Sequence, residues 1–182
     1  MNEPWEILRK VVAAFQVLQI DYMIVGSTAM RAYVPGRSTF DTDVLVRMTE
    51  AQLAQLSDEL GDDWLLEWEP ALQALKSGRM FNAIHYGTSW KLDLIPLKDS
   101  EFHKAEFRRR QLAQIGQIAC YVQSVEDLVV SKLHWAKLGG SKRQIEDVRG
   151  LLRSGLELDR EYIRKWSVDL GLDTLLAEAD SG

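Results

Sequence analysis

The chain has 182 residues, 46% hydrophobic and 27% charged, which is typical of a folded globular domain and not of a disordered or fibrous protein. Its net charge of −5 argues against binding nucleic acid by bulk charge alone, although it leaves room for a local basic patch. The single cysteine, Cys120, excludes an intramolecular disulfide and a cysteine-rich zinc site. No apolar run reaches the roughly 20 residues that cross a bilayer, and the N-terminus lacks a signal-peptide pattern, so we expect a cytoplasmic protein without membrane contact.

The first half of the chain alternates between helical and strand patterns. Gly26 ends the first predicted strand, and Ser27 and Thr28 are capping residues that open a helix before Pro35 stops it. A turn at 87–89 joins two β-rich segments and predicts an antiparallel hairpin. In chain order we expect helices over 4–19, 27–34 and 49–61, and strands over 22–26, 41–48, 79–87 and 90–97.

After Pro96 the pattern becomes mainly helical. We expect one short strand over 117–124, and helices over 100–115, 124–138, 141–154 and 159–179. These elements predict an α+β fold with a small mixed or antiparallel sheet, flanking helices and a C-terminal helical bundle. We place a core at 1–110 and a helical part, packed on that core, at 111–182.

Three aspartates form the most informative group. On a strand, residues i and i+2 point to the same face, so Asp41 and Asp43 can aim both carboxylates at one place. Asp93 lies between Leu92 and Leu94, in a segment suited to burial, where a carboxylate needs a cation, hydrogen bonds or a metal. It could complete a metal site or accept a proton from an attacking hydroxyl, and the alternative is a simple salt bridge with Lys91 or an arginine.

The pair Gly26-Ser27 supplies a candidate phosphate site. Glycine lets a backbone approach a ligand closely, and the free N–H groups at the start of the following helix favour a phosphate. The order strand, Gly-Ser, helix, strand with Asp-x-Asp would place a triphosphate beside metal ions held by the aspartates.

These motifs resemble the signature of the DNA polymerase-β-type nucleotidyltransferase superfamily, through "VGS" at 25–27, "RSTFDTDV" at 37–44 and "KLDLI" at 91–95. Residues 125–152 are similar to the C-terminal helical motif of its abortive-infection, toxin-type branch. The resemblance implies catalytic residues Asp41, Asp43, Asp93 and Lys132. It implies magnesium, as two ions, on Asp41, Asp43 and Asp93, and nucleotide contacts from Gly26, Ser27, Arg37, Thr39, Lys132 and Asp147.

By this resemblance the chain would transfer a nucleoside monophosphate from a nucleoside triphosphate to an acceptor hydroxyl. The toxin branch favours a tRNA 3′ end in a toxin–antitoxin or phage-defence setting, with an antitoxin protein as a partner. RNA would contact the basic run at 103–111, through Lys104, Arg108, Arg109 and Arg110. A solvated helix face is the plainer interpretation of that run.

Other interpretations stay open. The acceptor could be a small molecule or a protein, or the chain could be a non-catalytic nucleotide-binding module of the same fold. Lys132 lies on the inward stripe of its predicted helix, but its ammonium could instead extend to water. Asp147 could be an ordinary surface residue or a residue that pairs two helices.

Overall fold

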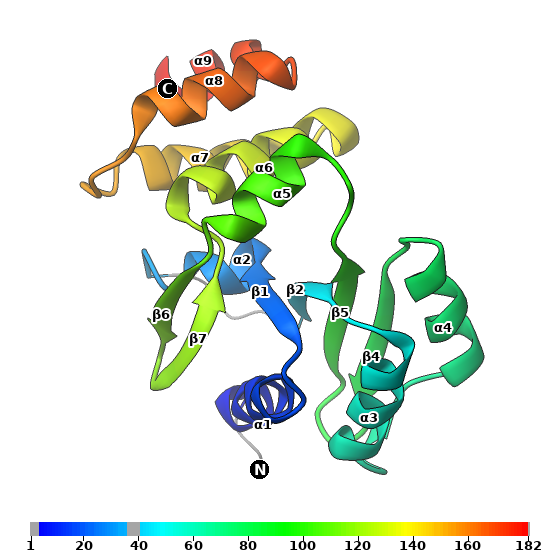
Figure 1. Ribbon diagram of the computed structural model, residues 1–182. Coiled ribbons are helices and arrows are strands. Elements are labelled where there is room, and N and C mark those ends of the chain that lie inside the picture. The colour runs from blue at the N-terminus through cyan, green and yellow to red at the C-terminus, as the bar shows by residue number, and fades with distance from the viewer. Residues whose placement is uncertain (1–3, 36–40, 182) are drawn as a thin grey trace.

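The computed structural model describes residues 4–35 and 41–181. Its strands form one seven-stranded sheet in the order β3-β4-β5-β2-β1-β7-β6 (Figure 1). The strands are β1 Asp21–Val25, β2 Asp41–Arg47, β3 Trp64–Leu65, β4 Phe81–His85, β5 Trp90–Pro96, β6 Gln111–Ile115 and β7 Ile118–Val122. The helices are α1 Pro4–Val17, α2 Gly26–Met30, α3 Glu50–Leu60, α4 Trp68–Lys76, α5 Glu101–Arg108, α6 Val125–Gly139, α7 Lys142–Leu152, α8 Arg160–Asp169 and α9 Asp173–Ser181.

The sheet is mixed, as predicted. β2 runs parallel to β5 and β1 runs parallel to β7, whereas the other neighbouring pairs are antiparallel. The predicted hairpin of β4 and β5 is confirmed, with Asn82 opposite Asp93. Together with α6 to α9, which pack on one another, this arrangement confirms the α+β prediction.

The two faces of the sheet have different partners because strand side chains alternate. Ile24, Val44 and Leu92 point to the face that α1 and α3 cover, where they join the largest apolar cluster. Val25 and Leu45 point to the opposite face and pack with Phe107 of α5. The helices α6 to α9 gather at the other end of the molecule from α1 (Figure 1).

The predicted helix over 100–115 is wrong beyond residue 108. Residues 111–115 form β6, which pairs antiparallel with β7 and places Leu112 opposite Tyr121. Gly116, with φ +60°, turns the chain between the two strands. Glutamine, leucine and alanine favour a helix locally, but the hydrogen bonds of the ladder decide the outcome here.

Three smaller predictions also need correction. The helix over 159–179 is interrupted where Gly171 has φ +66°, which separates α8 from α9. α2 ends at Met30, and turns follow to residue 34 in place of a continuous helix. The sequence patterns did not reveal β3 and α4.

The proposed division of the chain at residue 110 stays a prediction, although β6 and β7 lie beyond that position and belong to the sheet. Among the described helices, none has both the length and the apolar character that a membrane crossing needs.

Candidate active site

The three aspartates lie on one face of the sheet. Asp43 of β2 is directly opposite Asp93 of β5 in the parallel ladder, and Asp41 is opposite Lys91. Directly opposite residues of neighbouring strands point to the same side, as do residues two apart along one strand. The fold therefore gathers Asp41, Asp43 and Asp93, from two segments about 50 residues apart in sequence, on one side of the sheet.

This gathering perturbs the carboxyl group of Asp43. Burial, together with the neighbouring negative charges of Asp93 and Asp41, raises its pKa to about 6. The positive charges of Lys91 and Lys132 act in the opposite direction and lower the pKa of Asp43. The cluster contains more negative than positive charge, which is the environment that attracts a cation.

Asp93 is the most deeply buried of the three, with 6% of its surface exposed. Its Oδ2 accepts a hydrogen bond from Lys91 Nζ at 2.9 Å, so the predicted alternative, a salt bridge with Lys91, is present. Its Oδ1 is buried and has no hydrogen-bond partner among residues 4–35 and 41–181. A buried carboxylate oxygen without a partner is costly, and it is a ready ligand for a hard cation.

Gly26 lies against the carboxylate of Asp43. Its φ is +64°, and a Cβ at this position would be 2.8 Å from Asp43 Oδ2. Any side chain would therefore have to displace the carboxylate, and only glycine adopts this backbone conformation at little cost. The sequence places a glycine here because the end of β1 passes so close to the acidic group.

The helix that begins at Gly26, α2, is shorter than predicted. α2 has five residues, and Thr28 Oγ1 donates to the backbone oxygen of Asp41 at 3.1 Å, which ties α2 to the start of β2. The phosphate contact expected from Ser27 stays a prediction. Arg37 and Thr39 lie outside the described residues.

Lys132 of α6 is buried, with 4% of its side chain exposed, so it does not extend to water. Its Nζ donates to Asp147 Oδ2 at 2.6 Å and to Gln144 Oε1 at 3.2 Å, both on α7. Asp147 is therefore the partner of Lys132 and joins α7 to α6, which matches the alternative of a residue that pairs two helices. Gln144 was missed by the sequence analysis, although its position three residues before Asp147 puts both on one face of a helix. The contact of Lys132 with phosphate stays a prediction.

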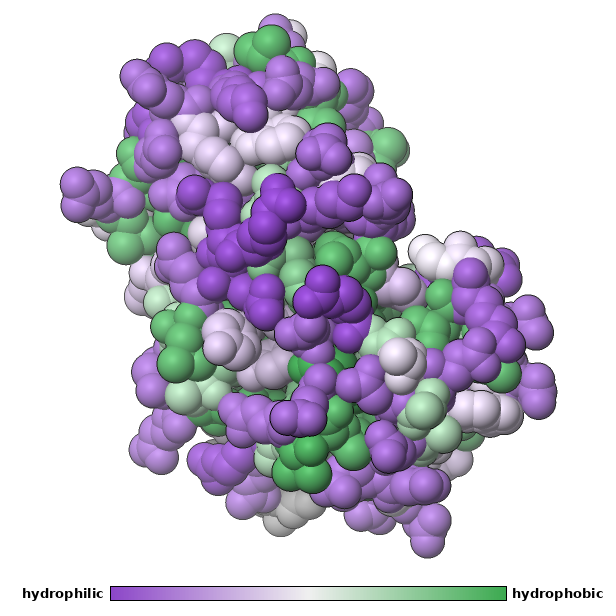
Figure 2. Space-filling model, in the orientation of Figure 1, coloured by the Kyte–Doolittle hydropathy of each residue, from purple (hydrophilic) through white to green (hydrophobic). Residues whose placement is uncertain are grey.

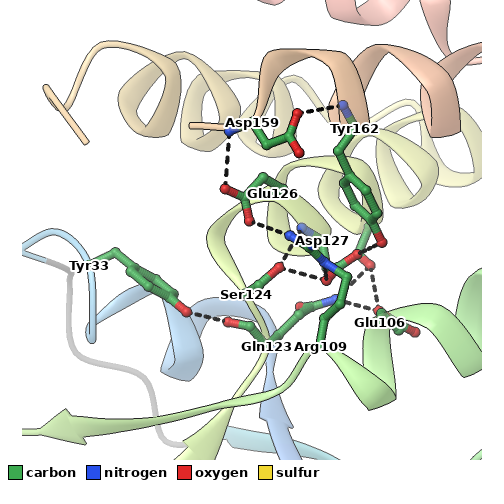
Figure 3. Close-up of polar contacts among 10 residues, drawn as sticks. Tyr33, Glu106, Arg109, Gln123, Ser124, Glu126, Asp127, Asp159 and Tyr162 are labelled. Carbon is green, nitrogen blue, oxygen red and sulfur yellow. Dashed lines mark hydrogen bonds and ion pairs between the residues drawn. The ribbon is translucent and has the colours of Figure 1, made fainter. Parts of the chain in front are cut away.

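A second polar network joins the sheet to the C-terminal helices (Figure 3). Tyr33 Oη donates to the backbone oxygen of Gln123 at 2.6 Å, and Gln123 Nε2 donates to Glu106 Oε2 at 2.5 Å. Tyr162 Oη of α8 donates to Asp127 Oδ1 at 2.6 Å. Burial, helped by the charge of Asp127, raises the pKa of Glu106 to about 8.

Three of the four cationic side chains of the basic run are paired with acidic side chains of this chain, and Arg109 joins this network. Arg109 contacts Glu126 at 2.9 Å and Asp127 at 3.2 Å, and its guanidinium lies 3.9 Å from the ring centre of Tyr162. Arg110 contacts Asp21 at 3.3 Å. Lys104 pairs with Asp99, while Arg108 is exposed. Figure 2 shows the most hydrophilic residues of this face gathered around α5.

The carboxylates suit magnesium by their chemistry, since oxygen ligands are those it prefers. Two observations support the fit: the partnerless Oδ1 of Asp93 and the close approach that Gly26 allows at Asp43. Within residues 4–35 and 41–181, no three acidic, histidine or cysteine side chains stand close enough together to hold an ion as they are arranged. Lys91 occupies the place beside Asp93 Oδ2.

The whole chain resembles solved structures. A solution structure of the antibiotic-resistance factor ANT(2'')-Ia superposes with a TM-score of 0.58 at 17% identity, covering 94% of this chain and 93% of that one. A crystal structure of ANT(2'')-Ia in complex with adenylyl-2''-tobramycin has a TM-score of 0.51 at 15% identity, covering 96% and 95%. The fold is that of the nucleotidyltransferases.

A third structure agrees with this assignment. An antigenic nucleotidyltransferase-like protein from Paracoccidioides brasiliensis has a TM-score of 0.51 at 15% identity, covering 97% of this chain and 93% of that one. No protein-family model and no curated protein matches the sequence. At 15–17% identity the likeness concerns the nucleotidyltransferase fold, and the toxin-type branch stays a prediction.

Proposed function

We propose that this chain is a magnesium-dependent nucleotidyltransferase that moves a nucleoside monophosphate from a nucleoside triphosphate to an acceptor hydroxyl. The observation that carries the proposal is the position of Asp41, Asp43 and Asp93 on one face, beside a glycine without room for a side chain, in a nucleotidyltransferase fold.

In the proposed reaction, an acceptor oxygen attacks the α-phosphorus, the bond from that phosphorus to the β-phosphate oxygen breaks, and pyrophosphate leaves. Asp41, Asp43 and Asp93 would hold two magnesium ions, which supply charge neutralisation when bound. Asp93 lies deepest, and would orient the acceptor hydroxyl or take its proton. Gly26 would let the triphosphate approach the backbone, and Asp147 would position Lys132 toward the phosphates. Most of the rate acceleration would come from this positioning.

We favour a small-molecule hydroxyl as the acceptor over a tRNA 3′ end. Arg109 and Arg110, which an RNA surface would use, are bound to acidic side chains of this same chain. The similar ANT(2'')-Ia complex contains an adenylylated small molecule, tobramycin, and the two chains cover one another almost completely. RNA modification in a toxin–antitoxin setting, with an antitoxin partner, remains the second candidate because residues 125–152 resemble the toxin-type branch.

The chemistry is tested by incubating the protein with magnesium and each α-labelled nucleoside triphosphate, together with tobramycin, a set of other polyols, or total tRNA. We expect label on an acceptor and release of pyrophosphate. Asp43→Asn should abolish both while the protein stays folded by circular dichroism. Transfer that is unchanged in Asp43→Asn, or equal in chelator and in magnesium, would contradict the proposal.

The two acceptor classes are separated by a charge variant. Arg108→Glu changes an exposed residue without breaking the framework that Arg109 and Arg110 maintain. Arg9→Glu is the matched control, because Arg9 is also exposed but lies on α1, which covers the opposite face of the sheet. An RNA acceptor requires that Arg108→Glu weaken transfer and reduce its salt dependence relative to Arg9→Glu. For a small-molecule acceptor, both variants should behave like the wild type.

A further inference from the structure

We propose that Lys91 is a built-in counter-ion, which neutralises Asp93 in the absence of a divalent metal and is displaced when the metal binds. This inference rests on the proposed function, since it concerns the metal site of the same reaction. It assigns to Lys91 a role in setting how tightly the carboxylates hold a cation.

The two partners of this ion pair differ in their freedom to move. Asp93 is on β5, an interior strand between β4 and β2, and 8% of its side chain is exposed, so its carboxylate is held in place by the sheet. Lys91 has 35% of its side chain exposed and carries its ammonium on a flexible four-carbon stem. The ammonium can therefore leave toward water, whereas the carboxylate cannot leave.

The position of Lys91 makes it a competitor for the cation. It is two residues before Asp93 on the same face of β5, and it is opposite Asp41 in the ladder with β2. Its Nζ donates a hydrogen bond to Asp93 Oδ2 at 2.9 Å, and the Asp93 carboxylate is one of the groups that would bind the metal. A metal ion on Asp93 and this hydrogen bond from Lys91 therefore compete for one group.

Without a metal, the site needs this positive charge. Asp43 and Asp93 are directly opposite one another, and Asp93 Oδ1 is buried without a partner in the part of the chain that the structure describes. The other nearby ammonium, that of Lys132, is held by Asp147 and Gln144 and is 4% exposed. Of the two cations that act on Asp43, Lys91 is thus the exchangeable one and Lys132 the fixed one.

The test measures binding of Mg²⁺ alone by calorimetry, and thermal unfolding in chelator and in saturating Mg²⁺. Lys91→Met keeps the length of the side chain and removes the competitor, so Mg²⁺ should bind about fivefold more tightly, the upper range for a partly exposed ion pair. In chelator Lys91→Met should unfold at a lower temperature than the wild type, and the difference should shrink in Mg²⁺.

Lys91→Arg separates competition from a general effect of charge. Arginine keeps the positive charge but can hold a carboxylate by two hydrogen bonds, so Mg²⁺ should bind no more tightly, and we expect it to bind more weakly, than to the wild type. Lys104→Met is the matched control. Lys104 lies on α5, its side chain is 39% exposed, and it is also paired with an aspartate, Asp99, which precedes that helix. Lys104→Met should leave Mg²⁺ affinity unchanged.

Equal affinity of Lys91→Met and the wild type for Mg²⁺, or a stability difference that is the same in chelator and in Mg²⁺, would overturn this inference alone. If the wild type binds no Mg²⁺ even with a nucleoside triphosphate present, both this inference and the proposed function fail. Should Lys91→Met not fold in chelator, the Lys91→Arg comparison by itself decides, because tighter Mg²⁺ binding by that variant would overturn the proposal.

Discussion

Gly26→Ala provides the sharpest test of how closely the backbone and the carboxylates fit. At φ +64° an alanine side chain costs about 1–2 kcal/mol. The new Cβ would also lie 2.8 Å from Asp43 Oδ2, too close for the two atoms to keep their positions. The Asp43 carboxylate must therefore rotate away from its place opposite Asp93, or the end of β1 must move.

The loss of stability can be separated from the loss of function. Gly78 has φ +65°, and, apart from its two chain neighbours, no described residue has a heavy atom within 4 Å of the Cβ that an alanine would add there. Gly78→Ala therefore carries the same backbone strain without the collision. The backbone strain should lower the free energy of unfolding of each variant by roughly 1–2 kcal/mol, which for a chain of this size corresponds to about 2–8 °C in melting temperature. The collision with Asp43 should add to this loss in Gly26→Ala alone.

Only Gly26→Ala should damage the site. We expect its affinity for a nucleoside triphosphate in the presence of Mg²⁺ to fall at least tenfold, about 1.4 kcal/mol, when measured by calorimetry or fluorescence titration. Gly78→Ala should bind like the wild type. If the two variants bind nucleotide equally well, the close approach of Gly26 to Asp43 has no role in binding, and the reasoning is refuted.

Three further outcomes follow from the buried charges. Lys132→Met should destabilise the protein by about 3–5 kcal/mol, because it leaves a carboxylate unpaired, and Lys132→Met combined with Asp147→Leu should recover most of that loss in chemical denaturation. The pKa of Glu106 is raised from 4.5 to about 8, so the folded state keeps a proton that the unfolded state releases, and stability should fall as pH rises from about 4.5 to 8. Glu106→Gln should remove that decline, with a gain over the wild type at pH 9 and none at pH 4. Because the pKa of Asp43 is about 6, Mg²⁺ affinity should decrease as pH falls through 6, and a pH-independent affinity between 5 and 8 would contradict its role as a ligand.

The shared face of Asp41 and Asp43 was predictable from the sequence because strand alternation has a fixed period of two, whereas the place of Asp93 beside them depends on the register of β2 with β5. The importance of Gly26 was likewise visible from its position at the end of a strand. Local patterns of this kind do not depend on knowing which distant segments meet.

The features that sequence patterns missed depend on distant partners. Arg109 belongs to a visibly basic run, but its partners Glu126 and Asp127 lie 17 and 18 residues away, so the sequence suggested only a solvated helix face or a surface for RNA. Residues 111–115 have local helical preference, and only their pairing with β7 makes them a strand. The pairing of Lys132 with Asp147 likewise follows from the packing of α6 on α7.

Lys91 and Lys132 both lower the pKa of Asp43, but their ion-pair partners lie in different places. Lys132 is paired with Asp147, outside the row of three aspartates, so a metal on that row leaves its ion pair intact. Lys91 is paired with Asp93, within the row, so the same metal replaces its ion pair. Saturating Mg²⁺ should therefore bring the stability of Lys91→Met close to that of the wild type, while Lys132→Met stays destabilised by the same amount as in chelator. Equal rescue of both variants would mean that Mg²⁺ acts by screening charge and not by displacing Lys91 from Asp93.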